Sequence, residues 1–152
     1  MPADNVTPFR RPPKRPVAPQ QSGLGFKTHR GKVVLAHVLT IGAFVLNVFF
    51  RMPPLSFLGM AVGIGAVALV YVNRGAAMPW ANTHHEHALR TLMIGYSIWV
   101  LASLLTYVHP VLGIATIYIQ LAVALWAVVR AVIALVLGVM RKPVPNPYGW
   151  LF

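Results

Sequence analysis

Cysteine is absent from this 152-residue chain, and acidic residues are nearly absent. Without cysteine there can be no disulfide framework, thiolate metal site, iron–sulfur cluster or cysteine nucleophile. The two acids, Asp4 and Glu86, lie far apart and supply no carboxylate pair for general acid–base catalysis. Neither a phosphate-binding loop nor a serine nucleophile elbow is present. We therefore expect a protein that is not an enzyme and has no cofactor.

Charged residues of both signs are also scarce. They make up 10% of the chain, against roughly a quarter in ordinary soluble domains, while 57% of the residues are hydrophobic. The surface of a soluble domain cannot be built from this composition. The composition predicts an all-α, polytopic membrane protein.

The net charge of +11 arises largely near the N-terminus, where seven of the thirteen Lys and Arg residues lie between Arg10 and Lys32. Residues 1–31 also contain six prolines and lack apolar periodicity, which predicts a disordered tail. Each basic residue near an anionic membrane surface contributes about 1 kcal/mol of attraction. We expect this tail to contact anionic lipid headgroups rather than nucleic acid, with docking onto a protein or RNA as the alternative. A cleavable signal peptide is not expected, because this polar segment precedes the first apolar run.

Apolar runs predict four transmembrane helices within a domain of residues 32–140. A helix rises about 1.5 Å per residue, so roughly 20 residues cross the hydrocarbon core. Prolines and the Asn73-Arg74-Gly75 turn separate the runs. The predicted spans are 33–50, 55–72, 88–108 and 111–130.

The last apolar run continues to Met140, which is longer than one span requires. We expect a span of 111–130 with Arg130 at its inner boundary, followed by a helical extension to residue 140. The alternative is a single tilted helix in which Arg130 is buried. Residues 141–152 hold three prolines and three aromatic residues, and predict an anchor at the membrane interface.

Basic residues also predict the orientation. With four spans, the loop on the other side from the termini holds only Arg51, whereas Arg74, Arg90, Arg141 and Lys142 lie on the side of the basic tail. Positively charged loops remain in the cytoplasm. We therefore expect both termini to be cytoplasmic, in a bacterial inner membrane.

The densest polar group begins at Thr83. Thr83 and Glu86 have the spacing of a capping box, which predicts that the third helix starts there. Glu86 and Arg90 are spaced for an ion pair one helical turn apart. We interpret the group as a polar helix cap, with partner contacts or proton chemistry as alternatives. The residues of this cluster are Thr83, His84, Glu86, His87, Arg90 and, from the fourth span, Arg130.

Histidines in this cluster raise the question of a metal. His84 and His87 share one helical face, and neutral imidazoles are common zinc ligands. No paired motif such as H-E-x-x-H accompanies them, so we expect no metal and retain these two as the candidates if one binds. His37 should lie at about the same depth as His87, which would allow haem ligation by two histidines. A histidine near a helix end more often bonds a neighbouring side chain.

Arg130 is an ionisable residue within an apolar run, and such residues are functional candidates. Its expected partner is Glu86, and the competing expectation, slightly favoured, is that its side chain reaches the inner headgroups. Gly59 and Gly63 form a G-x-x-x-G pair that permits close helix packing, within the chain first and between chains second. Asn47 and Gln120 are expected to hydrogen-bond between helices.

From residue 83 to about residue 145 the chain resembles an uncharacterised family of small bacterial four-helix membrane proteins. That family is itself distantly similar to the Tic-type translocon component of the chloroplast inner envelope. His85, Glu86 and His87 depart from the family pattern, as does Ala134, where glycine is common. The resemblance implies a four-helix membrane fold and suggests a channel or assembly role. The matching residues are Thr83-His84, Arg90-Thr91, Trp126, Arg130 and Lys142-Pro143.

These observations favour a non-catalytic accessory subunit or assembly factor of a larger membrane complex. Its expected partners are the lipid bilayer and other membrane protein subunits. The alternative is a small homo-oligomeric channel or transporter, for which Arg130, Glu86 and the glycine pair are the supporting residues.

Overall fold

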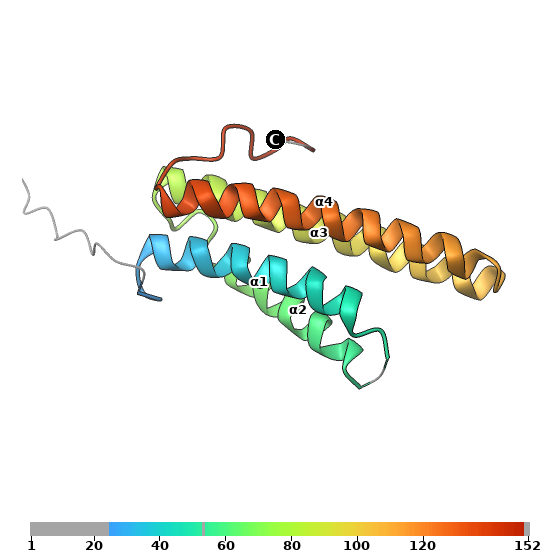
Figure 1. Ribbon diagram of the computed structural model, residues 1–152. Coiled ribbons are helices and arrows are strands. Elements are labelled where there is room, and N and C mark those ends of the chain that lie inside the picture. Colours follow the sequence, from blue (N-terminus) through green and yellow to red (C-terminus); the bar gives the residue numbers. More distant parts are fainter. Residues whose placement is uncertain (1–24, 53, 151–152) are drawn as a thin grey trace, which may run out of the picture.

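The computed structural model describes residues 25–52 and 54–150, and the regular structure of these residues is entirely helical. All four helices are long and apolar enough to cross a membrane, which confirms the predicted all-α, four-span architecture. The proposed disordered tail lies mostly outside the described residues. The helices are α1 (His29–Phe49), α2 (Ser56–Asn73), α3 (Pro79–Val108) and α4 (Leu112–Val139) (Figure 1).

The helices form two antiparallel hairpins, α1–α2 and α3–α4 (Figure 1). The hairpins lie together where α1 begins and α4 ends, and they diverge towards their turns. We call the end where α1 begins and α4 ends the terminal end of the bundle. The opposite end, where the α1–α2 and α3–α4 turns lie, is the hairpin end. The start of α3 and the finish of α2 also lie at the terminal end.

Two helices begin earlier than the sequence predicted. α1 begins at His29 because the Thr28 hydroxyl accepts a hydrogen bond (3.0 Å) from the backbone N–H of Gly31, which caps the first turn. α3 begins at Pro79, whose fixed φ suits the first helical position. The predicted start of this helix at Thr83 is therefore wrong. The Thr83 hydroxyl instead donates to the carbonyl of Trp80 (2.7 Å), within the helix.

The core between the two hairpins is apolar at its centre, where Phe44 of α1 and Leu92 of α3 are fully buried among alanines. Close approach of the helices depends on glycine. Gly59 of α2 packs against Asn47 of α1, and Gly63 packs against the Tyr96 side chain of α3. The structure therefore uses the G-x-x-x-G pair for packing within the chain.

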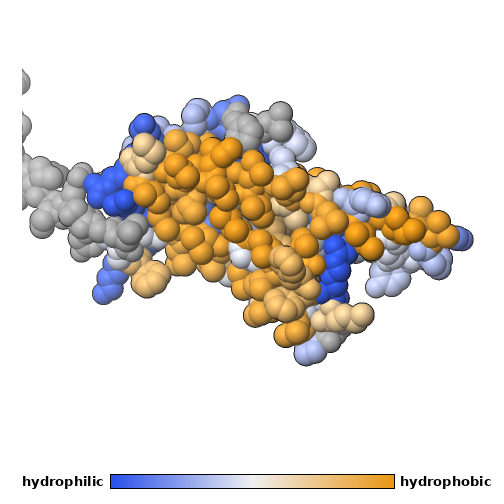
Figure 2. Space-filling model, in the orientation of Figure 1, coloured by the Kyte–Doolittle hydropathy of each residue, from blue (hydrophilic) through white to orange (hydrophobic). Residues whose placement is uncertain are grey.

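The outer surface is mostly apolar, as a lipid-facing surface must be. Figure 2 shows hydrophobic residues covering most of one face, with hydrophilic residues gathered near the start of α1. α4 is one continuous helix and exposes Leu125, Ile133 and Val136 along its length. The helix continues without interruption past Arg130 to Val139.

Candidate functional site

Four histidines are buried together at the terminal end of the bundle. His37 comes from α1, and His84, His85 and His87 come from the first turns of α3. Each is at most 2% exposed. We call them the histidine cluster. The His37 ring packs edge-on against His84, with ring centroids 5.3 Å apart, and against His87, at 6.1 Å.

Hydrogen bonds assign the protons in part of this cluster. His84 Nε2 lies 2.8 Å from the backbone carbonyl oxygen of Lys142, which can only accept, so Nε2 carries a proton. With one proton on the His84 ring, its Nδ1 is an acceptor. His37 Nε2, at 3.1 Å from that Nδ1, then donates to it. His37 Nδ1 is left as a basic nitrogen at the end of a two-imidazole chain.

Several imidazole nitrogens have no hydrogen-bond partner among the described residues. They are His37 Nδ1, His87 Nδ1 and both ring nitrogens of His85. Unpaired polar atoms in a buried site are costly, and a ligand or a proton bound at these nitrogens would reduce that cost. The cluster is the chemically richest place in the described part of the chain.

The described histidines and acids form no group of three positioned to hold a metal ion. The candidates His84 and His87 do lie in one cluster, together with His37. The two histidines that the sequence offers as haem ligands are His37 and His87. An axial bond from His37 Nε2 would have to replace its hydrogen bond to His84.

Arg130 of α4 is 1% exposed, so the slightly favoured expectation that it reaches the headgroups is wrong. Its Nε donates to the Thr91 hydroxyl (3.2 Å), and its Nη1 donates to the carbonyl of Gly149 (2.9 Å). The guanidinium also lies over the Trp126 ring, 5.2 Å from the centroid. Arg130 therefore joins α3, α4 and the chain beyond α4.

Glu86 does not serve as the partner of Arg130, contrary to the expectation from the sequence. Its carboxylate accepts from Arg90 at 3.1 Å, as the helical spacing predicted, and from Arg74 at 3.2 Å. Arg74 follows the end of α2, so Glu86 links α2 to α3 at the surface. Its side chain is 15% exposed. Because it pairs with two arginines, Glu86 has a structural role.

The chain after α4 folds back over α3 and α4 (Figure 1). We call residues 141–150 the C-terminal segment. Val144 N–H donates to the Thr83 hydroxyl (3.0 Å), the Trp126 indole donates to the Trp150 carbonyl (3.0 Å), and Arg90 stacks on the Tyr148 ring. The expected interfacial anchor is therefore held against the helices, and it covers the site that Arg130 occupies.

A second polar layer lies nearer the hairpin end. Asn47 donates to the Tyr96 hydroxyl (3.1 Å), which donates to the Gly59 carbonyl (3.0 Å). Gln120 of α4 donates to Ser103 of α3 (3.0 Å). These bonds confirm the predicted interhelical roles of Asn47 and Gln120.

Two participants at the terminal end were not singled out as candidates from the sequence. His85, which lies within the dense polar group that begins at Thr83, is fully buried. Lys32 donates to the Asn73 side chain (2.7 Å) and so ties α1 to the end of α2. A lysine at a predicted helix start carries no signal that distinguishes this contact from exposure to headgroups.

Comparison with known proteins does not assign the chain to a family. No family model, no curated protein and no solved structure matches this chain. The resemblance noted from residues 83 to 145 stays a prediction.

Proposed function

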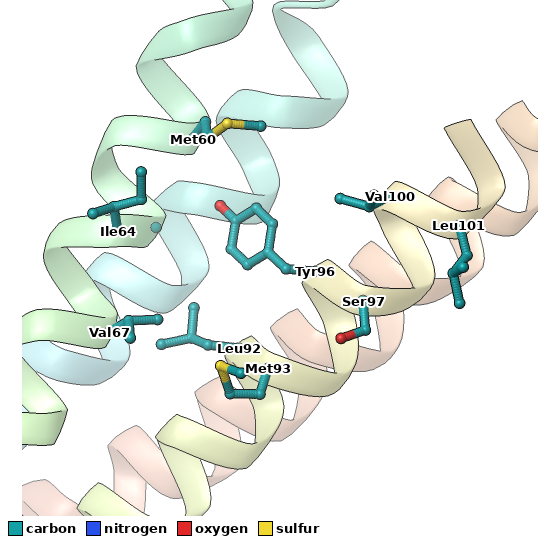
Figure 3. Close-up of a pocket in the computed structure, with 10 residues that line it drawn as sticks. Met60, Ile64, Val67, Leu92, Met93, Tyr96, Ser97, Val100 and Leu101 are labelled. Carbon is teal, nitrogen blue, oxygen red and sulfur yellow. The ribbon is translucent and has the colours of Figure 1, made fainter. Parts of the chain in front are cut away.

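We propose that this protein is a non-catalytic accessory subunit or assembly factor of a larger membrane complex. The observation that supports the proposal is an open apolar groove between α2 and α3, with a volume of about 660 Å³. Figure 3 shows the groove, with side chains from both helices lining it. We call it the α2–α3 groove. We infer that it receives a transmembrane helix of a partner protein.

The groove exists because one aromatic side chain separates α2 from α3. Tyr96 projects from α3 towards α2 and covers Gly63 (Figure 3). On either side of Tyr96, smaller or flexible side chains leave the space open, among them Met60 and Ile64 of α2 and Met93 of α3. The hollow is thus formed by packing inside the chain.

A helix is a better occupant of this groove than lipid alone. Lipid tails are as apolar as leucine, so helices in a membrane associate through close packing and interhelical hydrogen bonds. A shaped groove favours a partner with matching side chains, and Met60 and Met93 can adapt to them. The Ser97 side chain in the same lining offers one polar contact. These features favour a specific protein partner.

A non-catalytic role is supported by how the described polar groups are used. The one described acid, Glu86, is paired with two arginines. Arg130, which also bonds to Thr91, holds the C-terminal segment, and Asn47 with Tyr96 holds α1, α2 and α3 together. The histidine cluster is the exception, and it has no carboxylate among its hydrogen-bond partners.

The alternative is a channel or transporter formed by several copies. Buried Arg130 and the histidine cluster favour it, because intramembrane ionisable groups often mark ion or proton pathways. In the described residues, however, the apolar layer around Phe44 and Leu92 separates the terminal-end polar groups from Asn47 and Gln120. A pathway would therefore have to run between copies. It predicts flux that Arg130→Ala abolishes.

We further propose a bacterial inner membrane location with the terminal end in the cytoplasm. Basic residues support this orientation. Lys32, Arg74 and Arg141 lie near helix termini at that end, and Arg90 lies in the part of α3 nearest to it, whereas Arg51 follows α1 at the hairpin end. This asymmetry is the one that the positive-inside rule requires.

Site-specific photo-crosslinking in native membranes tests the proposed partner. A photoreactive phenylalanine derivative is placed at Ile64, in the groove, and as a matched control at Leu125, on the outer face of α4. The two side chains are 65% and 67% exposed. We expect Ile64 to give a crosslink of fixed mass to one other membrane protein, and Leu125 to give none of that mass.

Native mass spectrometry of the protein, extracted in mild detergent, gives the stoichiometry. A foreign subunit in a whole-number ratio supports the accessory role. A discrete homo-oligomer, with Ile64 crosslinked only to a second copy, would overturn it in favour of the channel. Crosslinks to lipid alone at both positions would overturn the partner helix.

A further inference from the structure

A basic hollow of about 410 Å³ opens at the terminal end of the bundle, apart from the α2–α3 groove. Residues before and within the first turn of α1 form one wall, and the start of α3 and the end of α4 complete it. Two lysine or arginine side chains come from α1 and its preceding turn, and a third, Arg141, follows α4. Its lining residues are Lys27, Thr28, His29, Arg30, Met78, Trp80 and Arg141.

No acid lines this hollow among the described residues. Glu86, the one described residue with a carboxylate side chain, pairs with Arg74 and Arg90 elsewhere. The first turn of α1 also lacks an acid, so its positive N-terminal end is not complemented. The hollow therefore concentrates positive charge without an internal counter-ion from the described chain.

Arg30 gives an independent sign that a ligand belongs here. The Arg30 side chain is partly exposed, but its Nε is buried and has no hydrogen-bond partner among the described residues. A buried N–H without an acceptor is costly, and the cost rises for a charged group. Guanidinium donors match the oxygens of a phosphate group in geometry and charge. An anion in the hollow would satisfy this donor.

Arg141 occupies a backbone position that favours glycine. Its N–H donates to the Gly138 carbonyl (3.1 Å), and the Lys142 N–H donates to Leu137 (2.9 Å), which together form a Schellman motif at the end of α4. Arg141 has φ +57°, in the left-handed region. At the corresponding position after α2 the chain has Gly75, with φ +82°. An arginine is thus held in a strained conformation where its side chain lines the hollow.

We propose that the hollow binds the phosphate of an anionic phospholipid headgroup. Trp80 in the lining is of the residue type that lies at headgroup depth. Exposed apolar side chains, including Val136, Val139 and Met140, precede Arg141 along α4 and offer a surface for acyl chains. A membrane-embedded protein meets such lipids at high local concentration. The phosphate would accept from Arg30 and lie close to the Arg141 guanidinium.

The full-length protein in neutral detergent is titrated with phosphatidylglycerol and, separately, with phosphatidylcholine, and bound lipid is counted by native mass spectrometry. We expect tighter binding of phosphatidylglycerol. Each basic residue near a membrane surface is worth about a fivefold change in affinity. Arg30→Gln and Arg141→Gly should therefore each weaken binding about fivefold.

Arg74→Gln is the matched control, because it removes one positive charge at the same end without touching the hollow. It should change the affinity less than twofold. Arg141→Gly relieves backbone strain, so its lower affinity cannot be attributed to unfolding. Equal loss of affinity in Arg74→Gln would show an unspecific charge effect and overturn the site. Equal binding of the two lipids would also overturn it. Complete competition by inorganic phosphate would show that the site binds a free anion and not a lipid.

Discussion

Replacing Gly59 by alanine should destabilise the fold, because this glycine sets the approach of α1 and α2. A Cβ atom at Gly59 would meet the Asn47 side chain and would lie 2.8 Å from the Asn47 backbone nitrogen. Backbone cannot rotate out of the way as a flexible side chain can. The two helices would have to separate along their contact.

The expected cost has two parts. Overpacking of a tight contact costs about 1–3 kcal/mol. Separation also strains the bonds from Asn47 to Tyr96 and from Tyr96 to the Gly59 carbonyl, and each interhelical bond in a membrane protein is worth roughly 0.6 kcal/mol. Together they predict a loss of about 2–4 kcal/mol in the free energy of unfolding, or a Tm lower by roughly 10 °C.

Gly65→Ala provides the control on the same helix. A Cβ at Gly65 would meet nothing within 4 Å, and alanine favours a helix over glycine by roughly 0.5–1 kcal/mol. This variant should be as stable as the parent or slightly more stable. Thermal unfolding in detergent, followed by tryptophan fluorescence, measures both variants.

Equal Tm values for the Gly59 and Gly65 variants would refute the close approach of α1 and α2. Native mass spectrometry of the same samples separates two causes. If Gly59→Ala left the Tm unchanged and dissociated an oligomer, the glycine pair would act between chains.

Three further results are expected. Arg141→Gly should raise the free energy of unfolding by about 1 kcal/mol in neutral detergent, measured by thermal unfolding, because glycine adopts φ +57° without strain; a lower Tm would contradict this. Single cysteines at Gly75 and Pro110, in a chain without native cysteine, should react with a membrane-impermeant maleimide from opposite sides, Gly75 only after the cells are opened; the reverse pattern would invert the orientation. In ¹⁵N NMR spectra the His84 and His37 rings should both carry their proton on Nε2, and a proton on His84 Nδ1 with none on Nε2 would contradict the assigned chain.

The four helices could be predicted from the sequence because membrane spans depend on a local property, the length of an apolar run. The residues at which helices start were harder to predict. Pro79 and Thr83 both favour a helix start, and the structure uses the proline, with α3 beginning there. The Thr83 hydroxyl bonds to Trp80 and to Val144 instead of capping the helix. The contact that the Thr83 hydroxyl makes with Val144, 61 residues away, leaves no local mark in the sequence.

The histidine cluster was predictable in part. Helical spacing places His84 and His87 on one face, and depth places His37 near them. The direct bond from His37 to His84 depends on how α1 rotates about its axis, and apolar runs leave that rotation open because most faces of a membrane helix are apolar. The burial of His85 depends on the rotation of α3 about its own axis, which the apolar runs leave open in the same way.

The partner of Arg130 could not be predicted because backbone carbonyls leave no mark in a sequence. The search for an opposite charge led to Glu86, since an isolated charge in a membrane is costly. The Gly149 carbonyl and the Thr91 hydroxyl satisfy the guanidinium instead. Glu86, the single described acid, links α2 and α3 instead through Arg74 and Arg90.

The C-terminal segment shows how irregular backbone can lie against membrane helices. A backbone polar group that is shielded from water requires a partner. Prolines at positions 143, 145 and 147 have no N–H to satisfy, and the carbonyls of Lys142, Gly149 and Trp150 accept from His84, Arg130 and Trp126. Arg130 is thus one of three donors that make the fold-back possible. Its burial is explained by the segment it holds, and any role in transport would have to be compatible with that bond.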